Sequence, residues 1–254
     1  MAGCALTSDV TCALSYAWSE GLLADDGAPL PALRAPGLHV VVVDLGLKRT
    51  MLRLLVHHGC RVTVVPAHTL ADAIFALAPD GVLLTNGPGD PSTSTDVVDT
   101  TARLLGEVPV FGICMGHQIL AQALGASTFK TRFGHRGANQ PVLAPDGRVL
   151  ITSQNHGFAV DPAQLCAGVT ASHTNLSDGT NEGVAAPERW AFGVQYHPEA
   201  APGPRDAEDH FARFVELMER FRQARHGTQT RAEAGQAKDL DASVSRTPPV
   251  AGAS

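Results

Sequence analysis

The strongest constraint on how this chain folds is a strand-like run that is apolar at nearly every position. The segment LHVVVVD, residues 38–44, is rich in β-branched side chains, which is typical of a strand buried on both faces of a sheet. A segment with helical spacing of its apolar residues follows, LKRTMLRLLVHH, and Gly59 ends it. A strand buried on both faces needs helices to cover it, so this beginning favours an α/β fold.

The same alternation continues along the chain. Further strands are expected at 61–67, 81–86 and 108–113, and helices at 95–106, 115–125 and 206–224. In the second half, the strand-like runs VLIT, GFAV, VTASH and WAFGVQY are separated by turn signals such as PDG and SDG. The predicted fold class is therefore α/β and flavodoxin-like. It has a mostly parallel central sheet flanked by helices, with a mixed or antiparallel extension.

Composition predicts three parts within the chain. Residues 1–36 end in the proline-rich PLPALRAPG and resemble a linker. Residues 37–225 carry the periodic apolar pattern of a folded domain. Residues 226–254 contain no aromatic side chain and are rich in Ala, Gly, Ser, Thr and Pro. Such a segment cannot bury enough apolar surface to offset its ordering entropy, so we expect a disordered tail.

Charge and cysteine usage exclude several classes of function. The chain has 254 residues and a net charge of −6, without a block of Lys and Arg, so we expect no nucleic-acid or membrane partner. No apolar run is long enough to span a bilayer, and the first residues do not resemble a secretory signal. The five cysteines are scattered without a CxxC pair. We therefore expect a cytoplasmic protein with reduced thiols and no metal site.

One cysteine has a distinctive setting. In GICMGHQ, Cys114 lies between Gly112 and Gly116, after a predicted strand and before a predicted helix. This is the pattern of a nucleophile elbow, a tight turn that tolerates no side chains at the flanking positions. The helix N-terminus would also favour the thiolate. A buried core thiol explains the pentapeptide about equally well, because free cysteine is often buried.

A histidine and a glutamate two residues apart follow the last predicted strand. In QYHPEA, His197 and Glu199 would point the same way on an extended chain, so that Glu199 can orient the imidazole. His197 could then take a proton from Cys114, the logic of a catalytic triad. On this segment alone, a surface His and Glu after a strand end is the more common arrangement.

A glycine-proline loop follows another predicted strand. In TNGPGDPS, Gly87 and Gly89 lie at the carboxyl edge of the sheet, where α/β proteins bind their ligands. Their backbone N–H groups could face an oxyanion or a substrate carboxylate. An ordinary tight turn is the simpler interpretation of this loop by itself.

Taken together, these segments resemble the class I, triad-type glutamine amidotransferases. Within that family the closer resemblance is to the small, glutamine-hydrolysing chains of carbamoyl-phosphate synthetase, over roughly residues 5–224. The elbow and HPE are shared by the wider family, whereas four stretches look specific to this branch: DLGLKR, FGHRGANQPV, SQNHGFAV and HPEAAPGP. The resemblance implies a glutaminase subunit that passes ammonia to a large synthetase subunit, in arginine and pyrimidine biosynthesis.

The resemblance also implies roles for individual residues. Cys114 is the nucleophile, His197 the general base and acid, and Glu199 its orienter. The groups that hold L-glutamine fall on Gly87, Gly89, Met115, Gln118, Asn155, Gly157 and Phe158. No metal and no cofactor are implied for this chain, since ATP is used by the large subunit. His117, His135, Arg136 and His156 are assigned structural or interface roles, and Cys60 and Cys166 are core or incidental thiols.

Two features of the sequence depart from the family pattern. Met115 stands where leucine is usual, a change that nearly conserves volume. The N-terminal domain of the family chain is represented only by a remnant in residues 1–36. Three alternatives keep the fold: an amidotransferase subunit for another synthetase, a stand-alone hydrolase of γ-glutamyl compounds, and a non-catalytic regulatory module.

Overall fold

The computed structural model describes residues 2–24, 26–35 and 37–225. The chain divides into two compact units, residues 1–218 and 219–254. Of the second unit, residues 219–225 are described, and they are helical. The predicted disordered tail, 226–254, lies outside the described residues.

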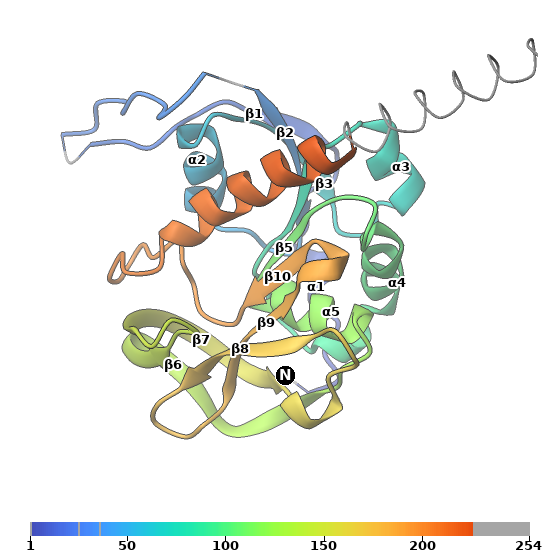
Figure 1. Ribbon diagram of the computed structural model, residues 1–254, viewed down its shortest axis with the longest axis vertical. Helices are drawn as coiled ribbons and strands as arrows, with labels where there is room; N and C mark the ends of the chain where they lie inside the picture. The colour runs from blue at the N-terminus through green and yellow to red at the C-terminus, as the bar shows by residue number, and fades with distance from the viewer. Residues whose placement is uncertain (1, 25, 36, 226–254) are drawn as a thin grey trace, which may run out of the picture. The chain divides into compact units, whose positions relative to one another are not determined.

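The first unit is built on a ten-stranded sheet (Figure 1). Its parallel centre contains the continuous apolar strands that the sequence predicts. In spatial order these are β3 (Cys60–Pro66), β2 (Leu38–Asp44), β4 (Gly81–Leu84), β5 (Val110–Ile113) and β10 (Ala191–Val194). An antiparallel extension continues from β10 through β9 (Asn181–Ala186), β8 (Thr170–Asn175), β6 (Thr128–Leu143) and β7 (Val149–Val160). The predicted α/β fold class, with its antiparallel extension, is confirmed.

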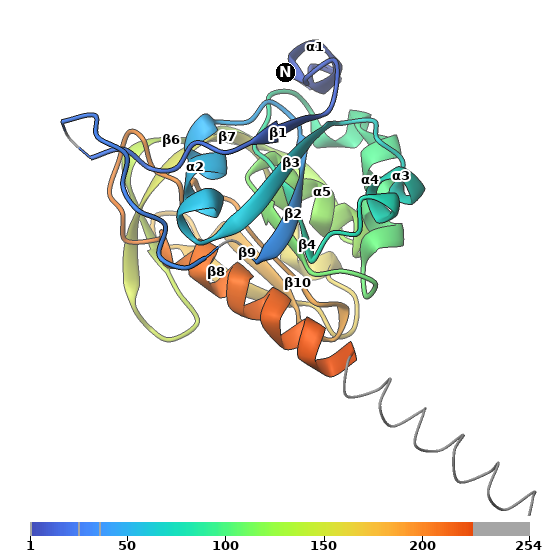
Figure 2. The ribbon, with the colours of Figure 1, turned by 90° about the horizontal axis from the view of Figure 1, so that it is seen from above.

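Helices cover both faces of the parallel strands (Figure 2). Along β2, Val40 and Val42 face one apolar core, and Val41 and Val43 face the other. The first core is closed by α2 (Arg49–His57) and by the helical residues 209–218. The second core is closed by α3 (Ala71–Ala76), α4 (Thr95–Leu104) and α5 (Met115–Ala123). Burial on both sides explains why the centre of β2, residues 40–43, is an unbroken run of valine. The described helices include none with the length and hydropathy needed to cross a bilayer.

Several elements differ from the sequence-based expectation. Within the segment expected to be a linker, residues 7–10 form α1 (Thr7–Val10), and β1 (Tyr16–Trp18) pairs antiparallel with β3 at the edge of the sheet. The runs VLIT and GFAV belong to one strand, β7, which pairs with a long strand, β6, that we did not expect. β6 is irregular in its register and contains Gly134 and Gly137 at positive φ, so it shows no clear alternation. α3, with six residues, is too short for a periodic signal.

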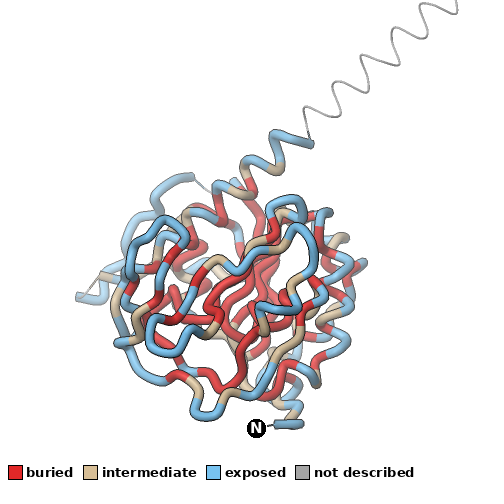
Figure 3. The backbone as a smooth tube through the Cα atoms, turned by 60° about the horizontal axis from the view of Figure 1, so that its bottom comes forward, coloured by how far each residue is buried: buried red, intermediate tan, exposed pale blue. Residues whose placement is uncertain are grey.

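The carboxyl ends of three neighbouring strands bring the predicted site segments together. β4, β5 and β10 are adjacent and parallel, with Leu84 opposite Gly112 and Ile113 opposite Val194. The GPG loop, the Cys114 turn and the HPE segment therefore leave the same edge of the sheet. Short 3-10 turns lie elsewhere at η1 (Pro91–Thr93), η2 (Pro162–Gln164) and η3 (Pro187–Arg189). Buried backbone is concentrated in the central strands from which these segments emerge (Figure 3).

Candidate active site

Cys114 sits on a sharp turn between β5 and α5. Its φ is 55° and its ψ is −103°, in the left-handed half of conformational space that cysteine rarely adopts. The turn is held by backbone hydrogen bonds: the N–H of Cys114 donates to the carbonyl of Val194 at 2.9 Å, and the N–H of Gly116 donates to that of Thr85 at 2.9 Å. Such strain, supported on both sides, is typical of a nucleophile elbow.

The two glycines beside Cys114 are required by close packing. A Cβ atom at Gly112 would lie 2.5 Å from the carbonyl oxygen of Gly116, and one at Gly116 would lie 2.2 Å from that of Leu84. These contacts are to backbone atoms of a strand and a helix, which cannot move aside easily. The spacing of glycines in the sequence therefore follows from how tightly the helix crosses the strand.

His197 and Glu199 form the hydrogen-bonded pair that the sequence suggests. His197 Nδ1 and Glu199 Oε1 are 2.7 Å apart, and both side chains are at least 95% buried. The segment is not extended, however, since β10 ends at Val194 and residues 198–199 form a turn. The two side chains meet across this turn rather than along a strand.

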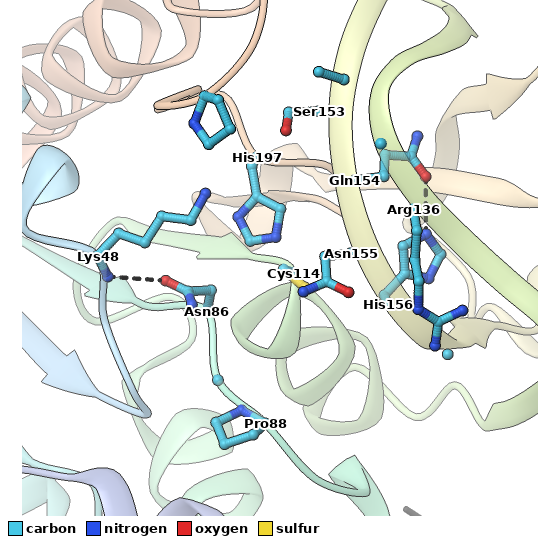
Figure 4. A pocket seen from close by; sticks show the side chains of 15 residues that line it. Lys48, Asn86, Pro88, Cys114, Arg136, Ser153, Gln154, Asn155, His156 and His197 are labelled. Carbon is cyan, nitrogen blue, oxygen red and sulfur yellow. Dashed lines mark hydrogen bonds between the residues drawn. The ribbon is translucent and has the colours of Figure 1, made fainter.

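Cys114 and His197 line the same pocket, and Figure 4 shows the two side chains close together between the other lining residues. Burial alone would lower the pKa of His197, but a hydrogen bond and the charge of the Cys114 thiolate, together with Glu199, raise it to about 10. The imidazole is thus held between a thiol and a carboxylate. This arrangement can generate a thiolate by transferring the proton of Cys114 to His197.

Lys48 is a member of the site that sequence reasoning missed. Its ammonium lies 3.0 Å from Glu199 Oε1 and donates to the carbonyl of Ala200 at 3.2 Å. Burial alone would raise the pKa of Glu199, but the hydrogen bond and charge of His197 and the charge of Lys48 hold it below its ordinary value. The available signal was a lysine at the carboxyl end of a predicted strand, inside the branch-specific stretch DLGLKR.

Two hydrogen-bonded side-chain amides, those of Gln118 and Gln195, lead to the Cys114 thiol. Gln118 Nε2 donates to the carbonyl of Phe158 and to Gln195 Oε1, each at 2.9 Å. Gln195 Nε2 in turn lies 3.7 Å from the Cys114 sulfur. Both donors of Gln118 are therefore used within the protein. Gln195, which the sequence did not single out, is the residue that touches the thiol.

The pocket has a volume of about 500 Å³. Three of the predicted glutamine-binding residues line it: Gly87, Asn155 and Gly157. The other four, Gly89, Met115, Gln118 and Phe158, are not among its lining residues. Gly89 instead packs against the N-terminal segment, where a Cβ atom would lie 2.7 Å from the carbonyl oxygen of Cys4. Met115 is the first residue of α5, so its backbone N–H lacks an intrahelical acceptor.

Polar side chains that were not predicted as substrate ligands complete the lining. Asn86 accepts a hydrogen bond from the Lys48 backbone N–H at 3.2 Å, and Arg136 donates to the carbonyl of Phe133 at 2.7 Å. Figure 4 shows Lys48 and Asn86 on one side of Cys114, with Asn155 and Arg136 on the other. The remaining newly found lining residues are Pro88, Gly137, Ala138, Ser153, Gln154, His156 and Pro202.

Replacing Glu199 with glutamine should destabilise the protein in a pH-dependent way. At pH 7 the loss should be about 3 kcal/mol, because the change leaves His197 buried without its carboxylate. The lowered pKa of Glu199 gives stability that is present above about pH 4.5 and lost as the pH falls through its folded-state pKa. The raised pKa of His197 gives stability that is present below about pH 6.5 and lost as the pH rises through about 10.

Urea unfolding of both proteins between pH 3 and pH 10 measures this difference. The gap in unfolding free energy should be widest near neutral or mildly acidic pH and should shrink at both ends. If the unfolding free energies of the two proteins changed in parallel with pH, the pair of His197 and Glu199 would contribute no pH-dependent stability.

The segment that carries Cys114, His197 and Glu199 matches a known family. The family model "Glutamine amidotransferase class-I" matches residues 41–217. This range contains the elbow, the glycine-proline loop and the His197–Glu199 pair. The chain belongs to the class I glutamine amidotransferase family. The family assignment expected from the sequence is thereby confirmed.

Three relatives of this chain are named as small chains of carbamoyl phosphate synthase. The chain is 46% identical to "Carbamoyl phosphate synthase small chain, chloroplastic" from Arabidopsis thaliana, over 87% of this chain and 52% of the relative. It is 55% identical to the small chain from Akkermansia muciniphila, over 70% and 48% of the two chains. It is 46% identical to the Escherichia coli K12 small chain, over 87% and 59%. The amidotransferase therefore spans about half the length of the relatives it matches.

A solved structure supports the fold of the amidotransferase. A Thermoplasma acidophilum protein, provisionally named a GMP synthase subunit, superposes with a TM-score of 0.66. The match covers 74% of this chain and 98% of the other, at 21% sequence identity. At that identity the likeness extends to the fold alone.

Proposed function

We propose that this chain hydrolyses L-glutamine to glutamate and ammonia, and that the ammonia passes to a large synthetase chain for carbamoyl phosphate synthesis. The observation that carries the proposal is the convergence of Cys114 and His197 on one pocket, with Glu199 behind the imidazole. A volume of about 500 Å³ suits a small amino acid, since small-ligand sites range from about 300 to 1,000 Å³. Relatives named as carbamoyl phosphate synthase small chains support the choice of product.

In the proposed reaction, His197 takes the proton of Cys114, and the thiolate attacks the side-chain amide carbon of glutamine. The tetrahedral intermediate collapses when the C–N bond breaks, and His197 gives its proton to the departing nitrogen, which leaves as ammonia. Water, deprotonated by His197, then attacks the γ-glutamyl thioester. Glutamate leaves and the thiol is restored. Glu199 holds the imidazole in place, and Lys48 holds Glu199.

Backbone and amide groups would bind the substrate. In this proposal the N–H groups of Met115 and Gly87 stabilise the oxyanion, because Met115 directly follows Cys114 and Gly87 lines the same pocket. Gly89 packs against the N-terminal segment and would act by shaping the loop. Asn155 and Gly157, which line the pocket, bind the amino-acid end of glutamine. Gln118 and Phe158 do not line the pocket, so in this proposal the hydrogen bond between them supports β7, which carries Asn155 and Gly157, and neither side chain contacts glutamine.

The proposed chemistry needs no metal or cofactor in this chain. The sequence has no GxxxxGK[ST] phosphate loop, so ATP would be used by the partner. The structure describes all five cysteines, and none of them forms a disulfide, which fits the proposed cytoplasmic location.

A glutaminase assay with and without a carbamoyl-phosphate synthetase large chain tests this function. We expect glutamine hydrolysis by the isolated chain and a stimulation of roughly 5- to 150-fold on adding the large chain, the range of ordinary coupling free energies. Stimulation only by a different synthetase would assign another partner. Unstimulated activity on other γ-glutamyl compounds would indicate a stand-alone hydrolase. Failure of a diazo-ketone analogue of glutamine to label Cys114 would favour a regulatory module.

A further inference from the structure

A cluster of metal-binding side chains lies beside the pocket and is not used by the proposed reaction. His135 comes from β6, His156 from β7 and Glu182 from β9. One nitrogen or oxygen from each residue lies within 4.8 Å of the others. The side chain of His135 is 10% exposed and that of Glu182 is fully buried. The cluster therefore joins three strands of the antiparallel extension in a nearly dry environment.

The outer nitrogens of both imidazoles are already held by acceptors. His156 Nδ1 lies 2.8 Å from the carbonyl oxygen of Phe158, and His135 Nε2 lies 3.0 Å from a carboxylate oxygen of Asp178. A carbonyl and a carboxylate accept hydrogen bonds, so these two nitrogens carry the protons. The inner nitrogens, Nε2 of His156 and Nδ1 of His135, face each other at 3.1 Å. Histidines that bind metals are oriented in this way by acceptors on the far nitrogen.

With one proton on each imidazole, the centre of the cluster has more acceptors than donors. Glu182 Oε1 lies 3.3 Å from His135 Nδ1, and Gln154 Oε1 lies 2.9 Å from His156 Nε2. Asn175 donates to Glu182 Oε1, whereas Glu182 Oε2 is buried without a hydrogen-bond partner among the described residues. A proton on His135 Nδ1 would leave that oxygen unpartnered. A buried, unpartnered carboxylate oxygen is costly unless a cation compensates it.

We propose that His135, His156 and Glu182 bind a single zinc-type divalent cation, with Gln154 Oε1 as a fourth donor. Tetrahedral zinc with bonds of about 2.0–2.2 Å separates its ligand atoms by roughly 3.3 Å. The corresponding distances here are 3.1 Å between the inner imidazole nitrogens, 3.3 Å from His135 to Glu182 and 2.9 Å from His156 to Gln154. The ligand atoms of the two histidines and Glu182 all lie within 4.8 Å of one another. Two imidazoles and a carboxylate suit zinc better than magnesium or calcium.

Charge and access agree with this assignment. Two positive charges would balance the carboxylates of Glu182 and Asp178. Gln154 and His156 also line the pocket, which gives an ion a route from solvent (Figure 4). The cation would tie β6, β7 and β9 together next to Asn155 and Gly157. It would be structural and would take no part in the attack by Cys114.

Zinc binding to the full chain, measured without glutamine, tests the site independently of the proposed function. Chelator-treated protein is titrated with zinc against a chromophoric chelator, and cobalt is used to record the absorption of tetrahedral coordination. We expect one zinc per chain. Glu182→Gln should weaken binding at least about 100-fold. Asp178→Asn removes the charge behind His135 while keeping an oxygen for the Thr180 N–H, and it should weaken binding about 10- to 100-fold.

Two controls separate this site from other binding. His68→Asn alters an exposed histidine that also pairs with a carboxylate, that of Asp96, and should leave zinc affinity unchanged. Cys114→Ser should also bind zinc as the wild type does. Circular dichroism checks that each variant folds, and half-exposed Asp178 provides a milder change should Glu182→Gln not fold. Wild-type binding weaker than about 10 μM, equal binding by Asp178→Asn or a folded Glu182→Gln, or loss of binding in Cys114→Ser would overturn the proposal.

Discussion

Replacing Cys114 with alanine is expected to lower glutamine hydrolysis by at least about 1,000-fold, because Cys114 carries the only thiol among the described residues that line the pocket. The variant protein should stay folded. The alanine side chain fits in the space that the cysteine side chain occupies, and alanine would have the same backbone conformation as Cys114. His197 would keep Glu199 as its partner, so the surrounding geometry should persist. A steady-state glutaminase assay, together with a thermal unfolding curve, measures both parts of this expectation.

Cys60→Ala is a matched control for this change. Cys60 and Cys114 are both 4% exposed. Cys60, however, is the first residue of β3, packs in the apolar core and does not line the pocket. Its loss should cost about 1 kcal/mol of stability and leave the rate of hydrolysis unchanged. If Cys114→Ala kept its activity, or if both variants lost activity equally, the thiol of Cys114 would not be the nucleophile.

The second large effect is expected at Gly116, through stability. In Gly116→Ala, the new methyl group would lie 2.2 Å from the carbonyl oxygen of Leu84 and 2.5 Å from its carbon. Both atoms belong to β4 at the centre of the sheet, so relief requires α5 to move away and the Cys114 turn to open. We expect a loss of about 3 kcal/mol or more in unfolding free energy, at the upper end of the cost of overpacking.

Urea denaturation measures this loss, with Gly106→Ala as the control. Gly106 has a φ of 84° and no atom within 4 Å of a Cβ, so alanine there should cost only about 1–2 kcal/mol of backbone strain. Gly116→Ala should therefore be clearly the less stable variant. Equal stability of the two variants would mean that α5 can withdraw from β4 at little cost.

Much of the parallel half of the fold could be predicted because most residues of its strands are buried. β2, buried at every residue, has the predicted boundaries, and β3, in which Arg61 is exposed, lies within one residue of them. β6 could not be predicted in this way. Its residues are mostly exposed or half-buried, and its glycines and register shifts interrupt the alternation on which a strand prediction depends.

The residues of the candidate site also differ in whether the local sequence reveals them. Cys114 and its glycines are recognisable because an elbow needs them next to one another in the chain. Lys48 and Gln195 gave no such signal, because their roles depend on partners far away in sequence, Glu199 and Gln118. Gln118 shows the converse, since the family resemblance assigned it to the groups that hold glutamine. The tertiary structure instead commits both of its donors to Phe158 and Gln195.

The sequence by itself determined the α/β class and the glycine-flanked turn that carries Cys114, and it suggested the pairing of His197 with Glu199. Each of these depends on residues within a few positions of one another, where backbone sterics and apolar periodicity act directly. Only the tertiary structure decided that Lys48 stands behind Glu199 and that His135, His156 and Glu182 converge. Those contacts are set by the order and register of strands, which no local pattern specifies.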